Sequence, residues 1–120
     1  MTLFHVKDGN KVGIYTPLSW DVSSNWKNDM ETFIFNLNQN KKYKKLIKDH
    51  SIYCDKKDGV YTSHFGNHSF CKTMEKIKHY SNYINKYYEN GSEILPTNNK
   101  EAFYDLFEVE IFKIMIENKQ

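Results

Sequence analysis

The chain has 120 residues, of which 39% are hydrophobic and 16% aromatic, and its formal net charge is +2 at pH 7. This length predicts one domain, residues 1–120, around one hydrophobic core, and no apolar run approaches the ~20 residues of a membrane-spanning helix. All 17 basic residues are lysine, and without the planar fork of arginine the composition argues against sequence-specific DNA reading.

Two hairpins are predicted. Residues 2–7 and 11–15 are β-prone runs on either side of Asp8, Gly9 and Asn10, a strong turn signal. Residues 51–54 and 60–65 form a second pair of such runs, joined by a polar loop that ends in a glycine.

Two helices are predicted between these hairpins. Apolar residues separated by four, three and four positions indicate an amphipathic helix: Trp26, Met30, Phe33 and Leu37. A shorter helix over residues 41–48 would turn Tyr43, Leu46 and Ile47 inward and its lysines outward.

The longest predicted helix covers residues 67–91 and organises the rest of the expected fold. Ser69 is its expected N-cap, and Asn90 and Gly91 favour a left-handed end. Its apolar positions cover more than the ~100° stripe that faces a core, and most of the surplus is tyrosine. These positions are Phe70, Met74, Ile77, Tyr80, Tyr83, Ile84, Tyr87 and Tyr88.

The C-terminal part contains a short helix capped by Thr97 or Asn98, followed by a run over residues 107–117 that fits strand or helix. We favour the strand, because apolar residues alternate with Glu108 and Glu110; one bulge reconciles the change of phase after Ile111. The expected class is therefore α+β, a mostly antiparallel sheet packed against the long helix and shorter helices.

Two cysteines and two histidines have the chemistry of a structural zinc site: Cys54, His64, His68 and Cys71. His68 and Cys71 would lie one helical turn apart, with His64 ending the preceding strand. No zinc-finger spacing is complete, so the alternative is two buried thiols and two surface histidines. Because no signal peptide precedes the first strand, we expect a cytoplasmic protein with reduced cysteines.

Interface-type side chains supply the other functional signal. Tyrosine and tryptophan bury a large area at little entropic cost, so the rim of the long helix and a loop tryptophan are predicted to bind a partner. Lysines could contact phosphates or an acidic protein surface, or form only a solvated face. With Asp105, Glu108 and Glu110 near the C-terminus they would make a bipolar surface. The predicted partner-binding residues are Trp20, Tyr80, Tyr83, Tyr87, Lys41, Lys42, Lys44 and Lys45.

The sequence supports a non-catalytic binding protein better than an enzyme, since no nucleophile–base–orienting set has a recognisable spacing. The alternative is a zinc-stabilised lysine and tyrosine module that binds single-stranded nucleic acid. A metal-dependent hydrolase that uses His68 is a third hypothesis. No membrane partner is expected.

Two short fragments resemble a group of Cas9 inhibitors among the anti-CRISPR proteins of phages and mobile elements. They are residues 3–6 with Asp8 and Gly9, and residues 104–107. This resemblance implies a small protein that blocks a host defence nuclease stoichiometrically, by contact and without turnover. It transfers no functional residue to this chain.

Overall fold

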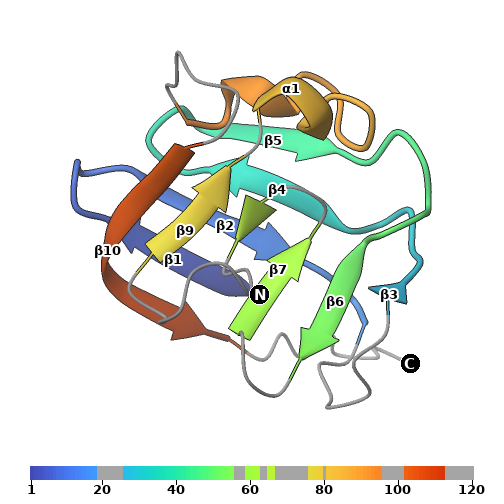
Figure 1. The fold of residues 1–120 in the computed structure, drawn as a ribbon, viewed down its shortest axis with the longest axis horizontal. Coiled ribbons are helices and arrows are strands. Elements are labelled where there is room, and N and C mark those ends of the chain that lie inside the picture. The colour runs from blue at the N-terminus through green and yellow to red at the C-terminus, as the bar shows by residue number, and fades with distance from the viewer. Residues whose placement is uncertain are drawn as a thin grey trace, which may run out of the picture.

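The computed structural model describes residues 1–18, 26–55, 59–62, 65–66, 76–79, 81–95 and 102–112. Nearly all of its regular structure is antiparallel sheet (Figure 1). The strands are β1 (Thr2–Val6), β2 (Lys11–Tyr15), β3 (Trp26–Lys27), β4 (Phe33–Asn36), β5 (Lys41–Lys44), β6 (Ile52–Asp55), β7 (Gly59–Thr62), β8 (Phe65–Gly66), β9 (Lys76–His79) and β10 (Ala102–Ile111). The described helical elements are α1 (Ser81–Ile84) and the 3-10 turn η1 (Gly91–Glu93).

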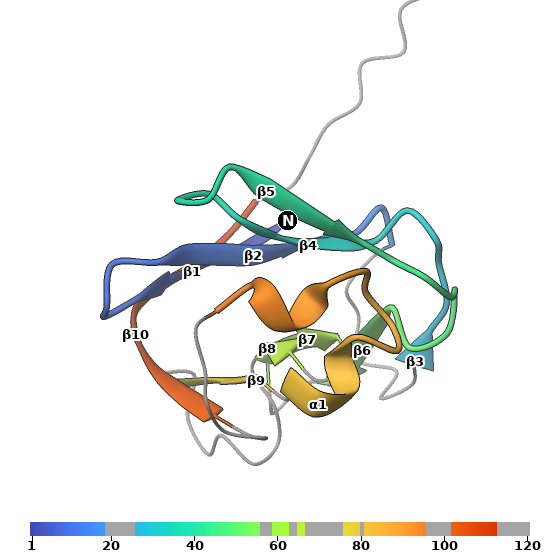
Figure 2. The ribbon, with the colours of Figure 1, turned by 90° about the horizontal axis from the view of Figure 1, so that it is seen from above.

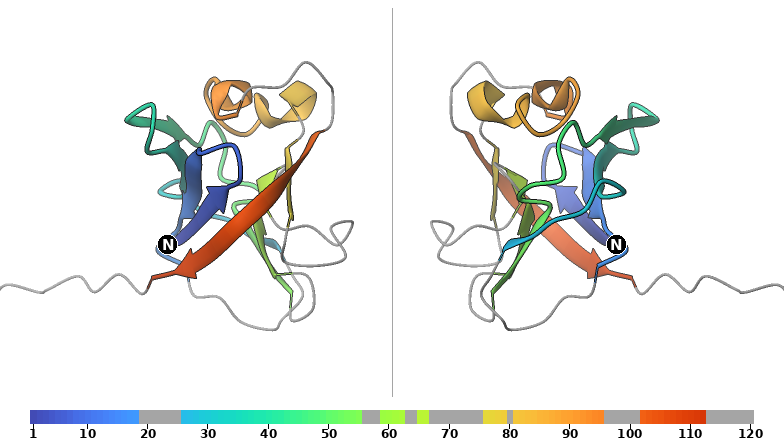
Figure 3. Two further views of the ribbon diagram at one scale, coloured as in Figure 1. Left: turned by 90° about the vertical axis from the view of Figure 1, so that its left-hand side faces the viewer. Right: turned by 90° about the vertical axis from the view of Figure 1, so that its right-hand side faces the viewer.

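The strands form one sheet in the order β3-β6-β7-β8-β9-β10-β1-β2-β4-β5, folded into two layers. We call β10-β1-β2-β4-β5 the first layer and β3-β6-β7-β8-β9 with β10 the second (Figure 2). β10 crosses diagonally from one layer to the other, and α1 and η1 close one end of the space between them (Figure 3). The core fills this space and includes Phe4, Val12, Ile14, Ile34, Tyr43, Phe65, Ile77, Ile84, Tyr88, Ile94, Leu95 and Leu106.

Both predicted hairpins are confirmed, except that Phe65, expected to end the second hairpin, lies in the separate strand β8, which pairs with β7. β1 and β2 pair in the register Phe4↔Val12, and Gly9 takes the positive φ of 100° that the turn requires. Asp8 Oδ1 accepts a hydrogen bond of 2.8 Å from the Asn10 amide, so the side chain stabilises the turn that its residue type favours. β6 and β7 form the second hairpin.

The C-terminal strand is also confirmed for the described residues, as β10. Its pairing with β1 shifts between Val6↔Leu106 and His5↔Glu108, so Phe107 is the extra residue of a bulge. The sequence predicted a bulge after Ile111, whereas the observed bulge is at Phe107. Leu106 faces the core, whereas its neighbour Phe107 is 78% exposed, as expected for successive residues of a strand, which point to opposite faces.

The predicted α+β class with a long central helix is wrong, and so are the two helices before it. Phe33 and Leu37 belong not to a helix but to β4 and the turn after it. Residues 33–35 are apolar on both faces of the sheet, which hides the two-residue period and imitates a helical one. The lysine-rich segment is strand β5, in which Tyr43 faces inward between Lys42 and Lys44.

The long helix fails for a different reason. Its described part is strand β9, then α1 of only four residues, then a turn. Three of its apolar residues do lie in the core: Ile77, Ile84 and Tyr88. They come from β9, α1 and the turn after α1, so their helical spacing in the sequence does not reflect a single helix. Residues 67–75 and Tyr80, and the start of the helix expected after Thr97, lie outside the described residues; from Ala102 the chain is strand β10, not helix. No helix within the described ranges is long and apolar enough to cross a bilayer.

Candidate interaction surface

Five aromatic side chains form a continuous line of ring contacts, which we call the aromatic strip: Tyr53, Tyr61, Trp26, His50 and Tyr87. Tyr53 stacks on Tyr61 with 5.1 Å between ring centroids. The Trp26 ring lies 5.2 Å from that of Tyr53 and 4.6 Å from that of His50. The His50 ring lies 5.6 Å from that of Tyr87. The strip therefore joins the second layer to the segment that follows α1.

Strand pairing explains the first half of the strip. Trp26 is opposite Tyr53 in the β3–β6 pair, and Tyr53 is opposite Tyr61 in the β6–β7 pair. Residues directly across an antiparallel ladder share a face, so the three rings form a row. Trp26 is 38% exposed at the free edge of the sheet.

Hydrogen bonds around Asp29 position the second half. The Asp29 carboxylate accepts from the Thr32 amide at 2.7 Å and from the Thr32 hydroxyl at 3.0 Å. The Asp29 amide donates to Lys48 O and to Ser51 Oγ, and Ser51 Oγ donates to Lys48 O. These bonds tie residues 48–51 to the segment after β3, which holds His50 beside Trp26.

Lys45 lies beneath one end of the strip. Its Nζ is 5.2 Å from the centre of the Tyr87 ring and 4.9 Å from that of Tyr88, and it donates to Asp49 O. Burial lowers the pKa of Lys45 from 10.5 to about 8, although Asp49 and Asp29 act in the opposite direction. Burial also raises the pKa of Tyr88, whose hydroxyl bonds Thr62 Oγ1.

Exposed apolar side chains border the strip. The Leu46 amide donates to Tyr87 O at 2.8 Å, and Leu46 and Ile47 are 48% and 43% exposed. Met30, next to Asp29 in the chain, is 52% exposed. Aromatic rings with an apolar border are typical of protein-binding surfaces.

The predicted partner-binding residues are divided between different faces. Tyr87 belongs to the aromatic strip and Lys45 lies beneath it. Tyr83, on α1, is exposed and lies under the Lys86 ammonium. Lys41 instead pairs with Glu93 at 3.3 Å, while Lys42 and Lys44 are exposed on β5. Trp20 and Tyr80 lie outside the described residues. The sequence did not predict the other four rings of the strip as partner-binding, because the strand pairing that brings them together is not visible in it. These rings are Trp26, His50, Tyr53 and Tyr61.

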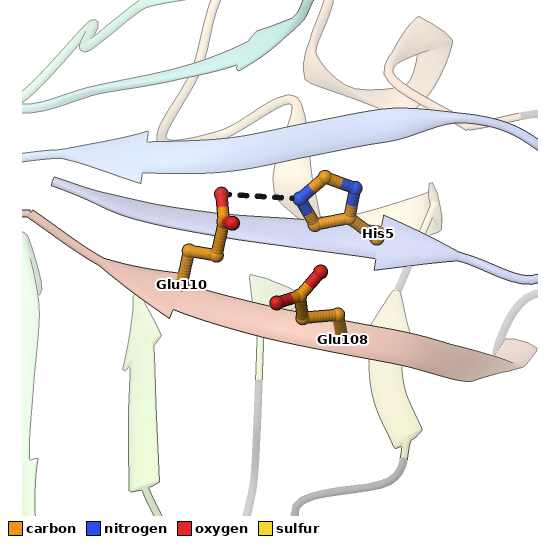
Figure 4. A group of neighbouring side chains, drawn as sticks. All are labelled: His5, Glu108 and Glu110. Carbon is orange, nitrogen blue, oxygen red and sulfur yellow. Dashed lines mark hydrogen bonds and ion pairs between the residues drawn. The ribbon is translucent and has the colours of Figure 1, made fainter.

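A second cluster lies on the first layer, where His5 on β1 meets Glu108 and Glu110 on β10 (Figure 4). His5 Nε2 is 3.2 Å from Glu110 Oε2, and one ligand atom from each residue lies within 4.8 Å of the others. An imidazole and two carboxylates could hold a divalent cation such as zinc. The sequence analysis identified Glu108 and Glu110 as part of an acidic surface. It could not place His5 beside them, because that neighbourhood depends on how β1 pairs with β10.

The described part of the chain contains only one of the four predicted zinc ligands, so it does not show whether they come together. Cys54 belongs to β6, while His64, His68 and Cys71 lie outside the described residues. That site stays a prediction.

The described residues define a two-layer antiparallel β domain with a strip of contacting aromatic rings, in which Trp26 is exposed and Tyr61 is buried. A comparison with protein-family models matches residues 1–116 to the TLDc domain, and the chain belongs to this family. Neither the curated proteins nor the solved structures contain a match. The resemblance to anti-CRISPR proteins is therefore wrong. Its fragments belong to the neighbouring strands β1 and β10, whose short alternating sequences are not specific to one family.

Proposed function

We propose that this TLDc domain is a non-catalytic, cytoplasmic binding module that contacts a larger protein through the aromatic strip and its apolar border. The continuous ring contacts from Tyr53 to Tyr87, with Trp26 exposed at the sheet edge, are the observation that supports this proposal. Rings held by neighbouring rings and by the Asp29 hydrogen bonds lose little entropy when a partner covers them.

A competition between variants tests this proposal. Trp26→Ala removes the central ring of the strip, and Ile47→Ser removes apolar border; Phe107→Ser is the matched control, because Phe107 is 78% exposed at the β10 bulge. Each protein is used as bait in a nuclease-treated cytoplasmic extract of its source cell, and retained proteins are quantified by mass spectrometry. A partner is then purified and titrated by calorimetry.

We expect one partner to be retained by the wild type and by Phe107→Ser, with a defined stoichiometry and at moderate salt. Trp26→Ala should weaken that affinity by about tenfold or more, since a buried aromatic anchor contributes more than 1 kcal/mol. Equal binding by all variants would refute the proposal. Binding that disappears on nuclease treatment and falls steeply with salt would instead support the nucleic-acid alternative.

A further inference from the structure

The cluster of His5, Glu108 and Glu110 is built by the pairing of β1 with β10. His5 lies directly opposite Glu108, and Glu110 lies two residues further along β10. Residues two apart on a strand share a face, so both glutamates lie on the face of His5. Figure 4 shows the three side chains turned toward one another. Backbone pairing therefore brings the donor atoms together without help from an ion.

The bulge at Phe107 aligns the glutamates with His5. Without the extra residue, Glu108 would lie opposite Phe4 instead of His5. Phe4 is fully buried, so carboxylates on its face would enter the core, which is costly. The bulge moves them to the face that carries the imidazole. Bulges in sheets are frequent beside functional sites, where they re-aim side chains.

The distances in the cluster suit a tetrahedral ion. His5 Nε2 and Glu110 Oε2 are 3.2 Å apart, and one donor atom from each of the three residues lies within 4.8 Å of the others. Ligands at ~2.0–2.1 Å from a tetrahedral zinc ion are separated from one another by about 3.3 Å. Rotation of the exposed Glu108 side chain brings its carboxylate to that separation.

The charges of the cluster suit a divalent cation. Imidazole binds a metal in its neutral form, so the two carboxylates supply the two negative charges that balance the ion. Among the described residues, Glu108 forms no ion pair, while Glu110 contacts His5. Lys11 is opposite His5 on β2, but it is exposed and makes no described ion pair with either glutamate. A bound cation would relieve the repulsion between the two carboxylates.

A hollow beside the cluster gives an ion access from water. It has a volume of about 340 Å³, and His5, Lys7, Lys11 and Phe107 are among the residues that line it. Three protein ligands leave one position of a tetrahedral zinc ion for water.

We propose that His5, Glu108 and Glu110 bind one zinc ion, which joins β1 to β10. The imidazole favours zinc over magnesium and calcium, which prefer ligand sets made of oxygen. His5 and Glu110 are 105 residues apart in the chain. Only the folded domain holds them together, so zinc bound by both stabilises the fold. The site lies outside the aromatic strip and is independent of the partner contact proposed above.

Calorimetric titration of zinc into the full chain, without an affinity tag and after chelator treatment, tests the site. His5→Gln, Glu108→Gln and Glu110→Gln each remove one ligand and keep a polar side chain. Glu89→Gln is the matched control, because Glu89 is an exposed glutamate outside the cluster. Circular dichroism verifies the fold of each variant. An NMR titration of the wild type locates the ion through the ring signals of His5.

Zinc bound by cysteine must be distinguished from zinc bound by this cluster. The double variant of Cys54→Ser with Cys71→Ser removes both thiols of the zinc site that the sequence predicts. It should keep the zinc ion of the cluster, as should Glu89→Gln.

Each ligand variant should bind that ion at least about tenfold more weakly, because even losing an outer partner of a metal ligand costs about 10–100-fold. Zinc should shift the His5 ring signals and raise the urea midpoint of the wild type but not of the ligand variants. Excess magnesium should not displace it. The proposal is overturned if the wild type binds no zinc, if the His5 signals do not move, or if the ligand variants bind as the wild type does. Binding that is lost in the double cysteine variant would also overturn it.

Discussion

At the scale of single residues, two buried threonines with opposite surroundings show how hydrogen bonding sets the cost of burial. Thr2 and Thr62 are both fully buried. Thr62 Oγ1 bonds the Tyr88 hydroxyl at 2.5 Å and contacts His50 O. Among the described residues, Thr2 Oγ1 finds no hydrogen-bond partner. A buried hydroxyl without a partner costs free energy, whereas a paired one is nearly neutral or favourable.

Replacement by valine should therefore have opposite effects at the two sites. We expect Thr2→Val to leave the free energy of unfolding unchanged or raise it by about 1 kcal/mol. Thr62→Val should lower it by about 1–2 kcal/mol, because the Tyr88 hydroxyl then stays buried without Thr62. Urea denaturation of both variants and the wild type measures the difference. A clear loss of stability in Thr2→Val would show that its hydroxyl does have a partner.

At the scale of elements, Lys45 links the end of β5 to the segment after α1. The two segments form an isolated bridge at Lys45↔Tyr88, and the Glu89 amide donates to Lys44 O. Lys45 is only 5% exposed, so at any pH at which its amine is protonated the folded protein holds a buried positive charge. The junction is therefore sensitive to pH.

The direction of this sensitivity follows from the lowered pKa. Between about 8 and 10.5, the folded and unfolded pKa values, the unfolded chain binds more protons, so the free energy of unfolding should rise with pH. The raised pKa of Tyr88 opposes this above pH 10.0, where an unfolded tyrosine ionises. Urea denaturation across the interval should show the rise in the wild type and in Lys48→Met, and lose most of it in Lys45→Met. An unchanged slope in Lys45→Met would assign the effect to another group.

The elements that could be predicted from the sequence are those with an unambiguous local signal. The Asp8-Gly9-Asn10 turn and the alternation of glutamates in β10 needed no tertiary information. β4 could not be recognised because Phe33 and Phe35 face outward while Ile34 faces inward, so polarity does not alternate. In the same way the sequence indicated interface tyrosines, but not the ring contacts of Trp26 and His50. Those contacts depend on which strands pair.

At the scale of the whole molecule, β10 makes the two layers one unit. It pairs with β9 through its first half and with β1 through its second. Leu106, at the point where the pairing changes, is 6% exposed in the shared core. If β10 detaches, both β1 and β9 lose a paired neighbour, so the described residues should unfold together.

Leu106→Ala tests this coupling. The substitution should lower the free energy of unfolding by about 2–4 kcal/mol through the cavity that it leaves. Tryptophan fluorescence and far-ultraviolet circular dichroism should still report coincident unfolding transitions. The exposed Phe107→Ala is the neighbouring control and should change stability by less than about 0.5 kcal/mol. Separate transitions for the two signals would mean that the layers are independent.

The pairing of the first described strand with the last has a further consequence during synthesis. His5 and Glu110 are 105 residues apart in the chain, so a ribosome must make almost the whole domain before β1 can acquire its neighbour on that side. Until then the nascent hairpin exposes the bonding groups of an unpaired edge, which other chains can capture. Slow refolding, and a need for chaperones at high expression, are the expected cost of this topology.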